Sequence, residues 1–202
     1  MKKVILGLAT VSALAYAEVN VQPYFGLDAV FGIPKVSYSD FYNETDPTKP
    51  ISKDVDNQTL GLRLKAGAKL DKWHLSANLY YEQYMQEDNI YNPIDSNKND
   101  DFYTGNAKSI TLGFEALRQF AVSDAFQVFV GAGAGFGKMD FGSSFDTSVT
   151  YGKVKAGAFV GISEGDELEI GLEYVMKNYD NINSIDEKTI NAYIGINFVT
   201  AK

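Results

Sequence analysis

The stretch TLGLRLKAGAKL, residues 59–70, alternates strictly between two kinds of side chain. Leucines and alanines occupy the even positions, while Arg63, Lys65 and Lys69 share the odd positions with Thr59 and two glycines. Because successive side chains of a β-strand point to opposite faces, this period of two predicts a strand with one apolar and one charged face. A water-soluble strand would bury the leucines, whereas a strand in a membrane barrel would turn them toward lipid.

The same alternation occurs in eight separate segments of the chain. A length of roughly ten residues suits a tilted strand that crosses a bilayer. No apolar run after the first part of the chain approaches the ~20 residues of a membrane helix, so any membrane embedding must use strands. The segments are residues 21–33, 59–70, 73–85, 109–116, 126–136, 153–163, 168–177 and 189–198.

The connections between these segments alternate in length. The long connection 34–58 is followed by the short one 71–72, and the long connection 86–105 by the short one 121–125; then come 140–147, the tight 164–166 and 178–186. Outer-membrane barrels have this pattern, with short periplasmic turns and longer outer loops. The sequence therefore predicts an all-β fold, an eight-stranded antiparallel up-and-down transmembrane β-barrel.

The amino terminus has the layout of a cleaved secretory signal. Two lysines precede an apolar stretch, which ends in Ala15-Tyr16-Ala17. Such a stretch is too short to span a bilayer, so we expect residues 1–17 to be removed and residues 18–202 to form one barrel domain. The chain has no cysteine and a net charge of −8, which excludes disulfides and Cys-ligated metal sites and argues against nucleic acid as a partner. We expect no cofactor and no metal.

Glycine distinguishes a membrane barrel from a lipocalin-like soluble barrel with an apolar interior. Every glycine inside the eight segments lies on the polar face, although glycine weakens a strand. An eight-stranded barrel has just enough room for side chains inside. We therefore expect the polar face to be the lumen, where long Lys and Arg side chains from one wall need bare backbone opposite them.

With the polar faces toward the lumen and the apolar faces toward lipid, the sequence predicts two groups of candidate residues. The charged residues of the polar faces are predicted to form a paired network in the lumen: Asp28, Arg63, Lys65, Lys69, Glu82, Glu115, Lys153, Lys155, Glu169, Glu173 and Lys177. The aromatic residues near the ends of the apolar faces are predicted to lie at the lipid–water interfaces: Phe31, Trp73, Tyr81, Phe120, Phe126, Phe136, Tyr174 and Phe198.

The chain resembles the small eight-stranded outer-membrane barrels, the OmpA-type and opacity-protein-like families. The resemblance covers essentially all of residues 18–202 and includes the last strand, NAYIGINF, with Tyr193 and Phe198 near its end. It implies a location in the outer membrane of a Gram-negative bacterium, contact with outer-membrane lipid and lipopolysaccharide, and insertion by the barrel assembly machinery. We expect no peptidoglycan-binding domain, since nothing follows the barrel.

The outer loops suggest a structural or surface-interaction role rather than an enzyme. Loops 34–58 and 86–105 are acidic and rich in Tyr and Asn, which are useful contact residues in recognition loops for host or matrix ligands. The alternative is a narrow porin or small-solute channel, in which the lumen charges set selectivity.

Two further motifs are weaker. His74, Ser76 and Glu82 share one strand face and echo the residue set of lipid A deacylases, but we expect His74 to be a hydrogen-bonding residue of the lumen or its rim. Residues 95–101 begin like a calcium-binding loop, yet Asp100 occupies the turn position that needs glycine. A solvated acidic loop is the expectation there.

Overall fold

The computed structural model describes residues 21–43, 46–85, 89–91, 101–103, 107–140, 146–163, 165–180 and 185–199, so the predicted signal 1–17 lies outside the described residues. Within these ranges no helix is both long and apolar enough to cross a membrane. The strands are β1 (Val21–Asn43), β2 (Asp46–Asp56), β3 (Thr59–Leu70), β4 (Trp73–Tyr84), β5 (Asn89–Tyr91), β6 (Asp101–Tyr103), β7 (Lys108–Ala121), β8 (Phe126–Asp140), β9 (Asp146–Gly161), β10 (Glu167–Tyr179) and β11 (Ile185–Val199).

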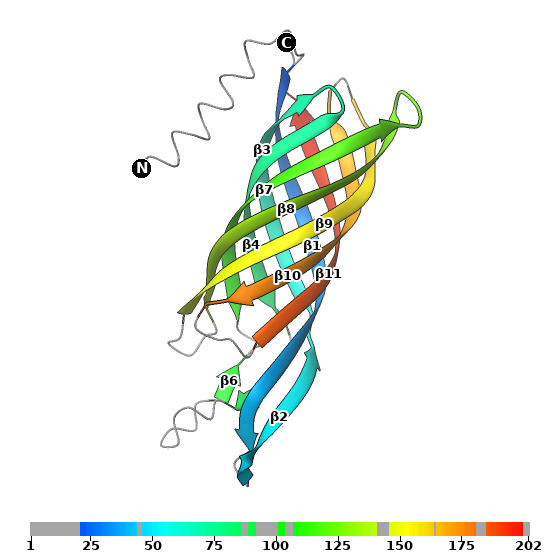
Figure 1. Ribbon diagram of the computed structural model, residues 1–202. Coiled ribbons are helices and arrows are strands. Elements are labelled where there is room, and N and C mark those ends of the chain that lie inside the picture. The colour runs from blue at the N-terminus through cyan, green and yellow to red at the C-terminus, as the bar shows by residue number, and fades with distance from the viewer. Residues whose placement is uncertain are drawn as a thin grey trace.

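Eight of these strands close into a barrel (Figure 1). Each strand pairs with its neighbour in the order β11-β10-β9-β8-β7-β4-β3-β1, and β1 pairs back onto β11. All pairings are antiparallel, and the closing seam matches Phe25 with Phe198 and Phe31 with Ala192. The predicted fold class is therefore confirmed. Closure satisfies the backbone of every barrel strand, which is required in hydrocarbon.

The apolar faces point outward along the central part of the barrel. Leu62 is 57% exposed on β3, while the next residue, Arg63, is 1% exposed. The same alternation is seen along β1, where Phe25, Leu27 and Phe31 are exposed. A wall of exposed leucine, isoleucine, valine and phenylalanine side chains is costly in water and stable in lipid.

Beyond this apolar band the alternation reverses at the long-loop end. On β9, Val149 and Tyr151 point inward, whereas Ser148 and Thr150 point outward. On this part of β9 polar side chains face outward and apolar ones face inward, as in a soluble barrel. This reversal is the reason why β9 begins at Asp146 rather than at the predicted residue 153: a search for one apolar outer face misses a strand whose polarity changes partway.

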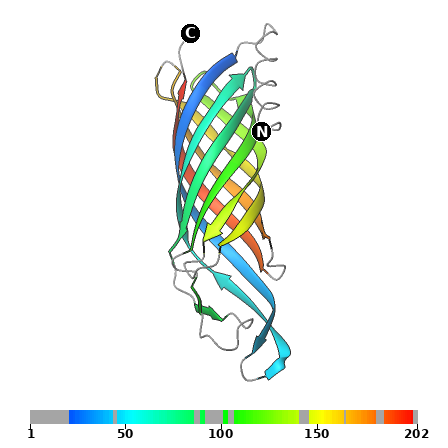
Figure 2. The same cartoon turned by 90° about the vertical axis from the view of Figure 1, so that its left-hand side faces the viewer.

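The prediction that residues 34–58 form a loop is wrong. β1 continues to Asn43 and β2 returns from Asp46 to Asp56, so this part of the chain is a hairpin arm that extends beyond the barrel (Figures 1 and 2). Residues of high strand propensity continue past Ile33 in VSYSDFYN. The second loop, residues 86–105, likewise contains a short hairpin of β5 and β6.

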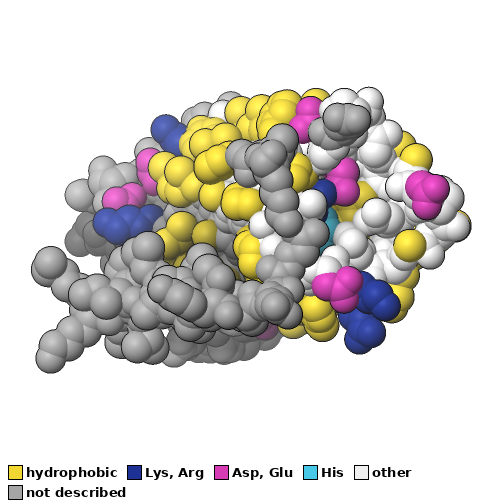
Figure 3. All heavy atoms as spheres, turned by 90° about the horizontal axis from the view of Figure 1, so that it is seen from above, with side chains coloured by type: hydrophobic (Ala, Val, Ile, Leu, Met, Phe, Trp, Pro, Cys, Tyr) yellow, Lys and Arg dark blue, Asp and Glu magenta, His cyan; other side chains and the backbone are white. Residues whose placement is uncertain are grey.

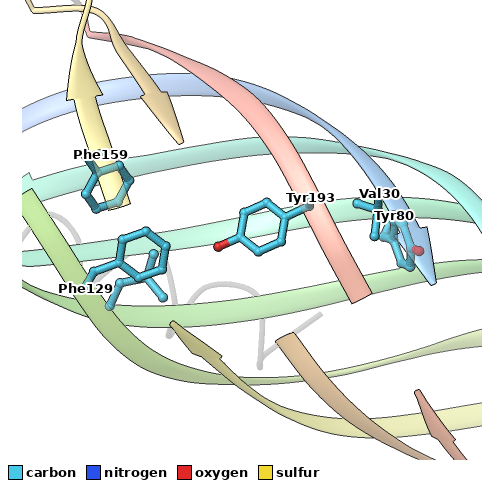
Figure 4. Packing of buried hydrophobic residues seen from close by; sticks show 6 residues of the cluster. Val30, Tyr80, Phe129, Phe159 and Tyr193 are labelled. Carbon is cyan, nitrogen blue, oxygen red and sulfur yellow. The ribbon is translucent and has the colours of Figure 1, made fainter. Parts of the chain in front are cut away.

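Inside the barrel, a small apolar cluster accompanies the charges. Phe129 and Phe159 face each other with ring centroids 4.5 Å apart, and Tyr193 lies along the lumen between this pair and Tyr80 (Figure 4). Val30 and Leu117 complete the cluster. The lumen is therefore filled by packed rings as well as by ionic groups.

Glycines give these side chains room on the neighbouring strand. A Cβ on Gly135 would lie 2.5 Å from the carbonyl oxygen of Leu112 and 2.5 Å from the ring of Tyr151, its cross-strand partner on β9. Gly61 is covered in the same way by Tyr80 of β4. The expectation that glycines face long Lys and Arg side chains from the opposite wall is therefore corrected for Gly135 and Gly61, where the nearest atoms belong to adjacent strands, whereas Gly113 of β7 meets the Tyr151 hydroxyl of β9, beyond its neighbour β8.

We predict that Gly135→Ala destabilises the barrel by about 1–3 kcal/mol, because the neighbouring strand and the Tyr151 ring must shift. The matched control is Gly152→Ala on β9, where an added Cβ would meet nothing within 4 Å. This control should be neutral or stabilising by about 0.5 kcal/mol, since alanine suits a strand better than glycine. Urea unfolding of the protein refolded into liposomes measures both, and equal stability of the two variants would contradict the packing role.

Candidate functional site

The centre of the lumen contains a closed ring of eight alternating charges. Following the contacts, Arg63 joins Asp28 to Glu173, and Lys65 joins Asp28 to Glu169. The other half of the ring is formed by Lys153, which joins Glu173 to Glu115, and Lys155, which joins Glu115 to Glu169. Four cations and four carboxylates thus neutralise one another. We call this set the charge ring.

The charge ring spans the barrel because its members come from five strands. β1 supplies Asp28, β3 supplies Arg63 and Lys65, β7 supplies Glu115, β9 supplies Lys153 and Lys155, and β10 supplies Glu169 and Glu173. The distances include 2.7 Å from Lys65 to Asp28, 2.8 Å from Lys155 to Glu115, and 3.4 Å from Lys153 to Glu173. All eight side chains are buried. Buried charges persist only when they are paired in this way.

A second polar cluster lies toward the long-loop end. Lys177 contacts Glu82 at 2.5 Å and Glu187 at 2.8 Å. Glu187 also accepts hydrogen bonds from the hydroxyls of Tyr84, at 2.6 Å, and Tyr179. Two carboxylates around one ammonium give this cluster a net negative charge. We call it the outer cluster.

The short-turn end of the lumen is closed by aromatic packing. The His74 ring stacks on Phe159 at a centroid distance of 4.5 Å and 10° between planes, and its Nε2 bonds the side chain of Gln119. The ring centroid of Tyr24 lies 5.8 Å from that of His74, with the two planes tilted by 58°. Nearby, Lys69 pairs with Glu167 at 2.7 Å.

Little space remains between the charge ring and the outer cluster. A void there has a volume of about 10 Å³ and is bordered by residues of both sets, among them Arg63, Glu173 and Lys177. Such a volume holds about one water molecule. The arrangement is that of a filled lumen, in which side chains from different walls interlock.

The structure brings the predicted lumen residues together inside the barrel. Eight of the predicted residues form the charge ring, Glu82 and Lys177 lie in the outer cluster, and Lys69 lies near the short turns. Sequence reasoning missed Glu167 and Glu187. Extending the polar-face spacing by two residues, from Glu169 back to Glu167 and from Thr189 back to Glu187, identifies both.

All eight predicted interface aromatics lie on the outer surface and are exposed. Trp73 and Phe126 begin their strands and Phe120 is the penultimate residue of β7, so these three lie at the short-turn end. Phe198 lies at the same end, while the others lie further toward the long loops: Phe31, Tyr81, Phe136 and Tyr174. Seen from the short-turn end, hydrophobic side chains occupy much of the outer edge (Figure 3). Their role as interface anchors stays a prediction.

The deacylase-like residue set does not form one site. His74 bonds Gln119, whereas Glu82 pairs with Lys177 in the outer cluster. His74 and Glu82 are eight positions apart on the extended strand β4, which corresponds to about 26 Å. The calcium-like stretch 95–101 falls almost wholly outside the described residues. Within the described ranges, no group of three or more His, Asp or Glu side chains is arranged to hold a metal ion.

An apolar outer wall, a closed antiparallel barrel and a charge-paired interior together define a transmembrane β-barrel of the outer membrane. The chain belongs to the outer membrane protein beta-barrel domain family, which it matches over residues 4–198. The location in the outer membrane of a Gram-negative bacterium, expected from the sequence, is confirmed by this membership.

Solved structures of small outer-membrane barrels share this fold. Neisserial surface protein A (NspA) is similar with a TM-score of 0.59 and 13% identity, over 86% of this chain and 95% of that protein. The outer membrane protein OprG from Pseudomonas aeruginosa is similar with a TM-score of 0.51 and 10% identity, over 90% and 97%. No curated protein matches the chain in sequence.

We predict that Glu115→Gln destabilises the barrel by about 3–5 kcal/mol, because it leaves two buried lysines with one distant carboxylate each. Lys153 and Lys155 would retain only Glu173 and Glu169, both at 3.4 Å. The control is Asp124→Asn in the exposed turn after β7, which should change stability by no more than about 0.5 kcal/mol. Urea unfolding in liposomes compares them, and a loss below about 1 kcal/mol for Glu115→Gln would argue against the charge ring as a stabilising unit.

Proposed function

We propose that this protein is a closed-lumen barrel of the outer membrane that presents a recognition surface to the outside of the cell. The observation that carries this proposal is the neutral charge ring, which fills the interior with side chains from five strands. Because the charged residues of the lumen pair with one another, we infer that a partner binds at the outer end of the barrel. We further propose that it is not an enzyme, because the hydroxyls that contact carboxylates, such as Ser109 on Glu82 and Thr189 on Glu187, are buried in the filled lumen.

The hairpin arm supports a role in recognition. β1 is one continuous strand that pairs with β11 as far as Tyr38 and continues with β2 to Asn43. The arm is therefore joined to the barrel wall without a flexible linker. Its sequence and that of loop 86–105 are rich in Tyr, Asn and acidic residues, which suit contacts to host or matrix ligands. The similar Neisserial protein is, by its name, a surface protein.

The free edge of β2 favours recognition by side chains over strand addition. Within the described residues β2 pairs only with β1, so its other edge is open. This strand contains Pro47 and Pro50, which lack a backbone N–H, and two lysines. Prolines and lysines on an edge strand discourage pairing with another chain.

We predict that shortening the arm, by replacing residues 39–54 with a tight turn, lowers adherence of expressing cells to host cells or matrix. The barrel should persist, because the arm extends beyond it. Heat-modifiable gel mobility and surface labelling establish equal folding and display. A variant with residues 39–54 in scrambled order serves as a control of equal length and charge. Adherence of the shortened variant at the wild-type level would contradict a role of the arm.

The alternative is a narrow porin or small-solute channel, and one observation favours it. Asn191 and Thr111 line the void, and their Oδ1 and Oγ1 atoms have no partner among the described residues. In a narrow channel, water or a small solute would form hydrogen bonds with such unpaired groups. A lipid A-modifying activity is the third possibility, and the separation of His74 from Glu82 counts against it.

We predict that the refolded protein shows no steady open state in planar bilayers, because the charge ring blocks the lumen. A general porin refolded in the same lipid is the positive control. Sustained conductance by this protein would favour the channel over the closed barrel.

We also propose that the outward face of the barrel contacts lipopolysaccharide. We further propose that the barrel assembly machinery inserts the chain and uses the last strand, β11, to do so. The apolar wall and the aromatic Phe198 near the end of β11 support both contacts.

A further inference from the structure

Arg118 is a cation that lies outside the lumen, among aromatic residues. On β7, Glu115 and Leu117 point inward, so Arg118 belongs to the outward face with Phe114 and Phe120. Arg118 is exposed, and its cross-strand partners are Trp73 of β4 and Val130 of β8. A charge on this wall requires a polar environment, since an arginine at mid-bilayer depth costs about 2–4 kcal/mol.

The position of Arg118 along the barrel provides such an environment. Trp73 is the first residue of β4, and β7 ends three residues after Arg118, at Ala121. Arg118 therefore lies at the short-turn rim, where tryptophan and phenylalanine mark the lipid–water boundary. Figure 3 shows this end of the molecule, where basic and acidic side chains lie among hydrophobic ones.

The guanidinium of Arg118 lies over the rings of two aromatic neighbours. Its Cζ lies 5.8 Å from the centroid of Trp73 and 5.6 Å from that of Phe120. These contacts are within the range of cation–π interactions. The rings offer no oxygen acceptor to the five N–H groups of the guanidinium, which donate in its plane and suit the two oxygens of an anionic group.

No carboxylate supplies that acceptor in the part of the chain that the structure describes, where Arg118 forms cation–π contacts and no ion pair. A second cation is close by: Lys72 is exposed in the turn between β3 and β4, and its carbonyl accepts a bond from the Gln119 backbone N–H at 2.8 Å. Two acids, Asp71 and Asp124, lie in turns beyond the strand ends, where water screens them.

We propose that Arg118, Trp73 and Phe120 form a binding site for the phosphate of a phospholipid headgroup in the periplasmic leaflet, with Lys72 as a secondary contact. The leaflet at the short-turn end of an outer-membrane barrel consists of phospholipid, whose phosphates lie at the depth of the aromatic boundary. A guanidinium fork binds two phosphate oxygens at once, and the two rings contact the glycerol and upper acyl region. The site therefore fixes the height of the barrel in the membrane on the β4–β7 side.

Trp73 makes the proposal testable, because it is the only tryptophan of the chain. The protein is refolded into phosphatidylcholine vesicles that contain either phosphatidylglycerol or diacylglycerol with brominated acyl chains, which quench tryptophan on contact. The two probes differ only in the headgroup. The quenching of Trp73 as a function of probe fraction gives the relative association of each lipid with the site.

For the wild type we expect phosphatidylglycerol to associate about fivefold more strongly than diacylglycerol, the ratio for one cation near an anionic headgroup. Arg118→Gln should reduce this ratio to about one, while its quenching by diacylglycerol stays unchanged. The matched control is Lys138→Gln, which removes an exposed outward cation of β8 at the opposite end. It should keep the wild-type ratio, and gel mobility confirms that both variants fold.

Two results would overturn the proposal. If Arg118→Gln keeps the wild-type preference for phosphatidylglycerol, Arg118 only extends toward water. If Lys138→Gln loses the preference to the same extent, the preference reflects overall charge and not this site.

Discussion

The charge ring is the constraint on which the interior of this barrel depends. Arg63 of β3 and Glu173 of β10 are 110 residues apart in sequence, yet they meet inside the lumen and are joined through shared partners to three further strands. Each ring cation contacts two carboxylates, and each carboxylate contacts two cations. A group removed from such a ring leaves both of its neighbours incompletely paired in a region of low dielectric. The interior is thus specified by mutual neutralisation more than by apolar packing.

The glycines and aromatic rings adapt the barrel wall to this interior. Tyr151 and Tyr80 lie over Gly135 and Gly61 of adjacent strands, so bulky rings fit within a lumen of eight strands. The same rings contact the charges, since the Arg63 guanidinium lies 5.0 Å from the Tyr80 ring and Lys155 lies 4.3 Å from the Tyr193 ring. Wall and interior are therefore one packed unit. A lumen that is filled in this way has little room for a ligand.

The sequence predicts this fold well where each strand has one apolar and one polar face. Residues 59–70 were expected as a strand and coincide with β3, because lipid on one side and the charge ring on the other demand strict alternation. The pattern fails where the barrel leaves the membrane, as on β9, because Tyr151 then points inward and Thr150 outward. The arm was missed for a related reason: neither face of a hairpin in water needs to be uniformly apolar. Which lumen charges pair with which could not be predicted, since this depends on the registers of several strands at once.

The charge ring also bears on how the chain becomes a barrel. Its carboxylates and ammonium groups come from the first strand of the barrel, from the penultimate one and from strands between them. An open sheet could not bring Asp28 and Arg63 of one side into contact with Glu173 of the other. Neutralisation and closure of the cylinder are therefore coupled, and a partly assembled sheet would keep its ionic face hydrated. This coupling favours an all-or-none final step of assembly, in which the last seam forms at the moment when the water around these groups is displaced.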